Sequence, residues 1–396
     1  KTTLSVTLPY RESGYFAPDE AGAVAYRFEA RRGQRLRIDV ELESIEPGRL
    51  FIDLFRPGPG SDAPEHLGSA AAGTGRLEVD APHDGIYLAR LQPELLRGGR
   101  YTLTQHALAS LRFPVPGKDG RAITSGFGDG RDGGRREHHG IDIVAPRGTP
   151  VVSASDGVVS SVAVTDIGGK VVWVADSARG LTLYYAHLDS QGVSTGARVQ
   201  AGDPLGIVGN TGNARTTVPH LHFGIYRRGE GPIDPMPFVH EAPAAPPPVP
   251  VDTSALGAWR RVAGISTPLT TSPGTRTAAV GELPRHTVVR VQGATASWYR
   301  VWLPDGRTGF VAIASTRALD EPLRTERRAV TSPIRDRPAP GAAALDYVEP
   351  DRLVSVLGRF NDYLLVRAGA GKTGWLASEG NDGEDRLAPE LRERRR

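Results

Sequence analysis

Histidines gather in three short segments of this 396-residue chain. Five of the ten histidines lie in these segments, namely His138, His139, His187, His220 and His222. Neutral imidazole is the commonest protein ligand for metal ions, and it is the usual proton carrier near neutral pH. Such a gathering predicts a site for metal or acid–base chemistry.

Strand geometry explains how some of these side chains can meet. His220 and His222 begin a segment whose other residues are mainly apolar or aromatic, the pattern of a β-strand. Side chains in a strand alternate faces with period 2, so both imidazoles are expected to point into one cavity. Residues 140–144 have the pattern of a second strand entry, and an upstream His138 can fold back to meet the Asp142 carboxylate.

Two histidines and one carboxylate make a three-ligand set that leaves one position for water. This is the pattern of a catalytic zinc site, whereas structural zinc sites usually have four ligands, often thiolates. The chain has no cysteine, which excludes a thiolate site. Other histidines remain for acid–base work, because zinc-bound water has a pKa of about 7 and a nearby imidazole can take its proton.

The three segments together resemble the lysostaphin-like, LytM-type zinc metallopeptidases, which are cell-wall endopeptidases. That family has an H-x-x-x-D motif, then Y-x-H-L, then H-x-H, and all three are present here in order. The resemblance implies one Zn²⁺ per chain, with His138, Asp142 and His222 as its ligands. It covers about residues 113–240 and implies an antiparallel-β metallopeptidase domain there.

The same resemblance implies roles for further residues. His220 would be the general base, and His187 would be a second catalytic histidine that positions the water or stabilises the oxyanion. Tyr185 is an accessory candidate, which either helps to hold this cluster or packs in the core. His139 stands at the variable position of its motif and is expected to point away from its neighbours.

Two loops near the site bear on substrate choice. Residues 214–218 replace the Ser/Thr-Gly pair that often precedes the last motif in the family, a departure that concerns substrate preference rather than the metal. Residues 129–136 are rich in glycine and charge, and a mobile loop at the cleft edge is expected there. Its arginines either meet substrate carboxylates or are solvated.

The composition indicates a mostly β protein of two to four domains. Its 48 glycines and 32 prolines help to break the sequence into short alternating runs. No run approaches the ~18 apolar residues of a membrane span. The net charge of +3 suits an anionic polymer. Because basic residues are not interleaved with aromatic ones, peptidoglycan is favoured over nucleic acid as the partner.

Residues 1–112 contain about seven short strand patterns, which predict an antiparallel β-sandwich. The region resembles the pre-peptidase domains of secreted bacterial proteases. It is either a targeting or regulatory module or a passive folding partner. As a regulatory module, it could shield the zinc cleft. The chain opens directly on a strand-like run, as a processed export product would, so an extracytoplasmic location (periplasmic or secreted) with the signal peptide removed is expected.

The C-terminal third begins with a proline-rich stretch, residues 241–256, which predicts an extended linker. An internal repeat follows, in which a Gly-Arg-Thr-Gly stretch recurs as Gly-Lys-Thr-Gly. The two copies, residues 257–322 and 323–382, each resemble a bacterial SH3-like barrel, a domain that often binds peptidoglycan. The charged tail, residues 383–396, is expected to be loose.

Together these patterns predict a multidomain zinc endopeptidase that hydrolyses peptide bonds in peptidoglycan stem peptides or cross-bridges by a zinc-activated water. The alternative is a non-catalytic or self-inhibited cell-wall-binding protein that regulates another hydrolase. The complete ligand set favours the enzyme. Loop chemistry does not choose between glycine bridges and D-alanyl–diaminopimelate cross-links, on which the family divides, and the oligomeric state is equally open.

Overall fold

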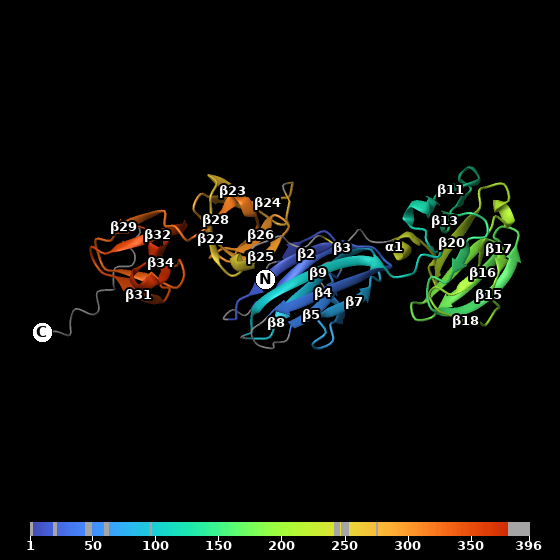
Figure 1. The fold of residues 1–396 in the computed structure, drawn as a ribbon, viewed down its shortest axis with the longest axis horizontal. Coiled ribbons are helices and arrows are strands. Elements are labelled where there is room, and N and C mark those ends of the chain that lie inside the picture. Colours follow the sequence, from blue (N-terminus) through green and yellow to red (C-terminus); the bar gives the residue numbers. More distant parts are fainter. Residues whose placement is uncertain are drawn as a thin grey trace.

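The chain is an elongated series of β-rich modules (Figure 1). The computed structural model describes residues 3–18, 22–43, 50–58, 63–95, 97–240, 246, 253–274 and 276–378. The predicted mostly β class is confirmed, because α1 (Met236–Val239) is the one α-helix of this described part. No helix within the same ranges is long and apolar enough to cross a membrane. Most of the predicted linker and the whole predicted tail lie outside the described residues.

The N-terminal module is a sandwich of two sheets. The first sheet has the spatial order β1, β3, β8, β5, β6, with bounds Thr3–Ser5, Val24–Ala30, Gly85–Pro93, Leu50–Arg56 and Glu65–Ser69. The second contains β2, β9, β4 and β7, with bounds Tyr10–Phe16, Gly99–Ala109, Gln34–Glu43 and Arg76–Asp80. Alternate residues along these strands are buried, and Tyr26, Tyr87 and Leu103 belong to the core that the two sheets share.

The second sheet continues beyond β2 into the first C-terminal repeat. Strand β25 (Val288–Thr295) pairs antiparallel with β2, so that Ser13 lies opposite Ala294 and Gly14 opposite Gly293. Strands of both modules therefore belong to one 11-stranded sheet. The sequence suggests two separate modules, and it did not predict this shared sheet.

A buried ion pair lies at this junction. Arg300 Nη2 is 2.9 Å from Glu12 Oε1, and the side chains are 6% and 0% exposed. The hydroxyl groups of Tyr10, Tyr26 and Tyr101 donate further hydrogen bonds to the same carboxylate. A charge buried without a partner is costly, so these charge-assisted bonds are what make the burial of both groups tolerable.

The two C-terminal repeats have the same strand order. In the first repeat, β24, β23, β27, β26 and β25 are neighbours and β22 also pairs with β25, with bounds Ala279–Pro284, Ser266–Thr270, Thr308–Ala312, Trp298–Trp302, Val288–Thr295 and Trp259–Val262. In the second repeat, the order is β31, β30, β34, β33, β32, β29, with bounds Ala344–Val348, Ser332–Arg335, Thr373–Ala377, Tyr363–Arg367, Leu353–Phe360 and Arg324–Arg327. Strand β28 (Thr316–Ala318) pairs with β22. The pairings of the described strands leave both sheets open rather than closed into barrels.

Equivalent glycines of the two repeats each lie against a neighbouring module, the sandwich for the first repeat and the first repeat for the second. Gly293 follows a register shift in β25, and a Cβ added there would lie 2.6 Å from the Glu12 carboxylate. Gly358 follows the same shift in β32, and a Cβ there would collide with Val288 and approach the backbone of His286. Close docking of both repeats therefore depends on residues without a side chain.

The central domain is built on a ten-stranded sheet. The main path runs β10, β13, β20, β17, β16, β15, β18, with bounds Ile123–Ser125, Ile141–Val144, His220–Arg227, Leu181–Gln191, Gly169–Asp176, Gly157–Thr165 and Arg198–Val199. Strands β14 (Pro150–Val152), β19 (Pro204–Val208) and β21 (Gly231–Ile233) extend it. One face of this sheet packs on a core that includes Ile143, Leu183 and Phe223, which frees the other face for polar residues.

The central domain contacts the sandwich through α1 and a surface ion pair. The ring of Phe238 in α1 fills the space beside Gly33, whose φ of +86° and lack of a side chain permit this approach. Arg179 Nε also lies 3.1 Å from Asp80 Oδ2 of β7. These contacts attach the domain to the sandwich.

Candidate metal centre

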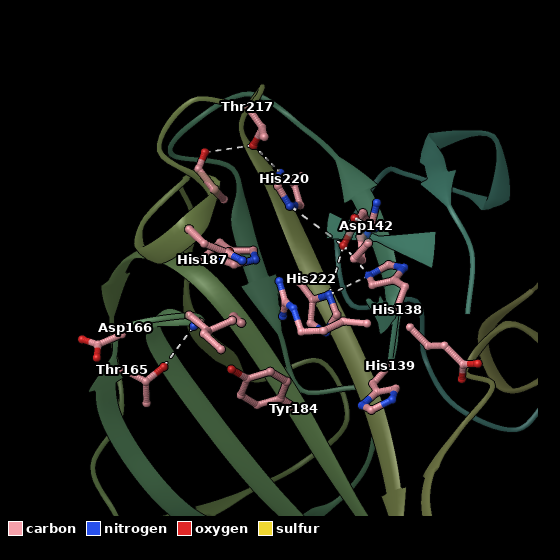
Figure 2. A pocket seen from close by; sticks show the side chains of 18 of the residues that line it. His138, His139, Asp142, Thr165, Asp166, Tyr184, His187, Thr217, His220 and His222 are labelled. Carbon is pink, nitrogen blue, oxygen red and sulfur yellow. Dashed lines mark hydrogen bonds and ion pairs between the residues drawn. The ribbon is translucent and has the colours of Figure 1, made fainter. Parts of the chain in front are cut away.

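The side chains of His138, Asp142 and His222 converge in one cavity (Figure 2). Asp142 of β13 lies opposite His222 of β20, so their side chains leave the same face of the sheet. His138 comes just before β13 and reaches the same point. Its Nε2 is 3.0 Å from Asp142 Oδ1 and 2.9 Å from His222 Nδ1, and the last two atoms are 3.0 Å apart.

These three atoms have the spacing of ligands around one small metal ion. Ligand atoms about 2.0–2.2 Å from a tetrahedral zinc ion are roughly 3.3 Å from one another. The measured separations are near that value. Within the described residues, this is the one cluster of histidine and acidic side chains with metal-binding spacing.

Contacts around His138 and Asp142 prepare both groups to bind a cation. His138 Nδ1 donates to the Gly126 carbonyl at 2.7 Å, which leaves the lone pair on Nε2, the atom that faces the cluster. Burial alone would raise the pKa of Asp142, but its contacts with His138 and His222 outweigh this effect and hold the pKa well below its usual range. The carboxyl group is therefore ionised and needs no deprotonation before it binds a metal.

His187 and His220 stand beside this cluster, with their ring centres 5.0 Å apart. His187 Nδ1 donates to the Thr211 carbonyl at 2.9 Å, and His220 Nδ1 donates to the Val218 carbonyl at 2.8 Å. The lone pair of each ring is thereby placed on Nε2, and His220 Nε2 is 3.9 Å from Asp142 Oδ1. Two imidazoles with basic Nε2 atoms next to a metal position suit the removal of a proton from water.

His187 is held in a strained and buried position. Its φ of +62° lies in the left-handed region, which costs energy for a residue with a side chain. Its backbone N–H donates to the Gly168 carbonyl at 2.8 Å, which helps to fix this conformation. Burial, with the neighbouring charges of His220 and His222, lowers the pKa of His187 to about 4. The ring is therefore neutral near pH 7.

Comparison with known proteins assigns the family of this region. The Peptidase family M23 profile matches residues 136–235. This range contains the three residues of the ligand cluster and the two histidines beside it. Residues 136–235 form an M23 peptidase domain. The predicted resemblance to lysostaphin-like and LytM-type peptidases is thus confirmed for this part of the chain.

Two curated relatives and one solved structure match part of this chain. The L-Ala–D-Glu endopeptidase of Bacillus subtilis (strain 168) is 37% identical over 152 residues, which are 36% of this chain and 45% of that protein. The peptidoglycan DD-endopeptidase ShyC of Vibrio cholerae is 40% identical over 119 residues, which are 29% of this chain and 26% of that protein. A structure of LytU is 37% identical and covers 31% of this chain and 88% of its own, with a TM-score of 0.29. This chain therefore spans less than half the length of either curated relative.

The M23 domain places Tyr185 in its core, which is the packing alternative left open for this residue. Tyr185 is fully buried, packs with Phe223, and its hydroxyl group accepts a hydrogen bond from the Ala154 N–H at 2.8 Å. Tyr184 lines the cavity instead, with its ring 5.7 Å from that of His222. His139 was expected to point away from its neighbours, but it is exposed on the cavity wall.

The cavity has a volume of about 700 Å³ and opens on the surface of the M23 domain. Its described lining residues all come from positions 131–226, so the N-terminal sandwich does not cover it. This arrangement contradicts the predicted version in which the sandwich shields the cleft. Asn213, Ala214 and Thr217 belong to the lining, so the loop that departs from the family pattern does border the cleft.

The glycine-rich segment before His138 differs from the expected mobile loop. It forms a hairpin of β11 (Gly130–Arg131) and β12 (Arg136–Glu137), in which Gly133 and Gly134 have positive φ. Arg131 turns back from this hairpin and makes an ion pair with Asp142, Nη2 to Oδ2, at 2.6 Å. The sequence does not single out this residue, because nothing in the glycine-rich segment indicates which arginine faces the cluster.

Proposed function

We propose that the chain is a zinc-dependent endopeptidase that hydrolyses peptide bonds of peptidoglycan, and that it acts outside the cytoplasm. The observation that supports this most directly is the set of three ligand atoms 2.9–3.0 Å apart, with two basic imidazoles beside it. The names of the two relatives, both endopeptidases and one of them a peptidoglycan enzyme, support the reaction and the substrate class.

His138, Asp142 and His222 would hold the metal. Two imidazole nitrogens and one carboxylate are a donor set that zinc favours in catalytic sites. When bound, zinc would lower the pKa of a water molecule to about 7 and polarise the scissile carbonyl group. The lone pair of His138 Nε2 and the ionised Asp142 carboxylate already face the cluster in the form that binds a metal.

In this proposal, His220 is the general base, since its Nε2 faces the cluster with a lone pair and accepts a proton from water. His187 has the same tautomer and a pKa of about 4, so in the resting enzyme its Nε2 also accepts rather than donates. Stabilisation of an oxyanion by His187 would therefore require transfer to this ring of the proton that His220 takes from the water. His187 is proposed as the second catalytic histidine, which holds the water before reaction and supports the oxyanion only after this transfer.

The proposal leaves the cleaved bond to experiment, because the names of the two relatives specify different bonds. The purified chain should be incubated with purified cell walls of different cross-link types, with and without a chelator, and the released peptides should be identified by mass spectrometry. Chelator-sensitive release of peptides is expected, and the new termini identify the bond. A zinc-loaded chain that releases no peptide from any wall would contradict the proposal.

A further inference from the structure

The hairpin of β11 and β12 contacts the cluster of His138, Asp142 and His222 at two points, through His138 at its end and through Arg131. Gly128 N–H donates to the His138 carbonyl at 2.8 Å, and His138 N–H donates to the Asp129 carbonyl at 2.9 Å. Arg131 stands at the start of the same hairpin. One short segment therefore carries a metal ligand and a cation that contacts another ligand, Asp142.

The two carboxylate oxygens of Asp142 have different partners. Oδ1 faces the imidazole atoms of His138 and His222 at 3.0 Å each. Oδ2 accepts a hydrogen bond from Arg131 Nη2 at 2.6 Å. Oδ1 is therefore the oxygen presented to a metal, and Oδ2 is turned toward a fixed positive charge.

Arg131 is itself held in place. Its Nη2 also donates to Ser125 Oγ at 2.7 Å, and Ser125 Oγ donates to Asp129 Oδ2 at 2.7 Å. The Asp129 carboxylate accepts the Gly126 N–H at 2.8 Å as well. The guanidinium group is thus positioned by a short polar chain that runs from the hairpin to Ser125, at the end of β10, and on to Asp129.

We propose that Arg131 is a positioning residue of the metal centre, which keeps Asp142 a one-oxygen ligand and attaches the hairpin to the metal site. This inference rests on the proposed metal-dependent function. Partners that orient metal ligands typically change metal affinity 10- to 100-fold when they are removed. With Oδ2 engaged, the carboxylate presents one oxygen, and the metal keeps a position for water.

The consequence for a variant follows from the chemistry of Asp142. In Arg131→Gln, the long cationic fork is replaced by a shorter neutral amide, so Oδ2 is released to bind the metal together with Oδ1. Arg131→Lys keeps the charge but replaces the planar group by a single ammonium, which cannot reproduce the geometry of the contacts with Ser125 and Asp142. Ser125→Ala keeps Arg131 and removes one of its supports.

The test measures metal binding apart from turnover. Zinc affinity of the full chain should be determined by competition with a chromophoric chelator, and the visible spectrum should be recorded with Co²⁺ in place of zinc. Arg131→Gln is expected to bind zinc about 10- to 100-fold more weakly, because the loss of the fixed orientation of Asp142 outweighs the contact that Oδ2 gains. The visible absorption bands of its Co²⁺ form should lose intensity, because a second oxygen of Asp142 raises the coordination number of the metal. Arg131→Lys and Ser125→Ala should show smaller losses, and the exposed Arg198→Gln should match the parent chain.

The outcomes separate this inference from the proposed function. Parent chain that binds no zinc would contradict the function itself. Parent chain that binds zinc, with an unchanged affinity and Co²⁺ spectrum in Arg131→Gln, would overturn the positioning role alone. A higher KM with unchanged metal binding would do the same, because it would assign Arg131 to substrate. If Arg131→Gln does not fold, Ser125→Ala decides, and unchanged metal affinity and Co²⁺ bands in that variant would overturn the role.

Discussion

Asp142 and His222 face each other across β13 and β20, and their ligand atoms lie 3.0 Å apart. This pair joins two of the three motifs through strand register alone. A shift of one residue in that register would turn one of the two side chains to the core face. The metal centre therefore depends on the pairing of these strands as much as on the identity of the residues.

The roles of the two histidines of the last motif can be separated by substitution. His222→Ala removes a metal ligand, so we expect zinc content to fall to background and hydrolysis to be lost. His220→Ala removes a base but no ligand, so zinc content should remain while turnover falls about 10²- to 10⁴-fold. Zinc content by atomic absorption and peptide release from cell walls check both. His83→Ala, an exposed side chain of the sandwich, serves as a control. Full turnover in His220→Ala would refute its assignment as the base.

Removal of the metal should destabilise the M23 domain. A ligand that binds only the folded state adds about 2.7 kcal/mol when its free concentration is 100 times its Kd. We expect calorimetry of the full chain to show one transition that moves to lower temperature with a chelator and returns with added zinc. The same treatment of His222→Ala should shift nothing. An equal shift in that variant would place the stabilising metal elsewhere.

Acid should weaken the sandwich through Asp53. Burial raises the pKa of this carboxyl group, but hydrogen bonds from Ser69 and Arg90 outweigh burial, and the net pKa is lowered. A carboxyl whose folded pKa is depressed stabilises the fold above its unfolded pKa of about 3.9, and this contribution is lost as pH falls through the folded value. We therefore expect protection of β5 and β8 against hydrogen exchange to fall as pH drops below about 4. Asp53→Asn should be less protected at pH 5 and should lose less on acidification.

A control for this pH effect is the exposed Glu41→Gln on β4, which should behave like the parent chain. If Asp53→Asn and the parent chain lose protection in parallel between pH 5 and pH 3, the carboxyl group does not contribute the pH dependence. The comparison at each fixed pH removes the intrinsic effect of pH on exchange.

The buried ion pair should dominate the stability of the junction between the sandwich and the first repeat. Glu12→Gln leaves Arg300 buried without a carboxylate, and the loss of one partner of a buried pair costs about 3–5 kcal/mol. Replacement of both residues by apolar side chains of similar volume should cost much less than the sum of the single changes. Urea unfolding followed by tryptophan fluorescence checks this, since Trp298 and Trp302 flank Arg300 on β26.

A matched comparison is Arg35→Met, which breaks a half-exposed pair with Asp80. Such pairs contribute about 0–1 kcal/mol. A cost for Glu12→Gln as small as that for Arg35→Met would show that the other acceptors of Arg300, Gln292 and the Tyr101 hydroxyl group, satisfy the buried guanidinium.

The sequence predicted that His138, Asp142 and His222 gather in one place, because short motifs and strand periodicity act locally. It left Tyr185 open between the site and the core for a physical reason. In a regular strand, Tyr185 and His187 would share one face, yet Tyr185 pairs opposite Phe223 on the core side and His187 reaches the cavity. The positive φ of His187 breaks the alternation and turns its ring to the other side. No pattern in the sequence marks that residue as left-handed.

Contacts between residues far apart in the chain could not be predicted from the sequence patterns. The internal repeat could be recognised in the sequence because its two copies share residues at a nearly constant spacing. The pairing of Gly14 with Gly293 joins residues that no periodicity relates, and the Glu12–Arg300 contact follows from it. The contact of Arg131 with Asp142 depends on how a glycine-rich hairpin folds back, which loop composition does not determine.

The contacts made by Gly293 and Gly358 show how one repeat can follow another. Gly293 and Gly358 stand at equivalent positions, so each repeat carries the same small residue toward its neighbour. The turn that receives the second repeat, at His286, also recurs, since Asp351 has a similar φ of +60° and Leu353 after it is 58% exposed. One repeat thus holds both halves of a repeat-to-repeat contact, a glycine that docks and a turn that can be docked upon.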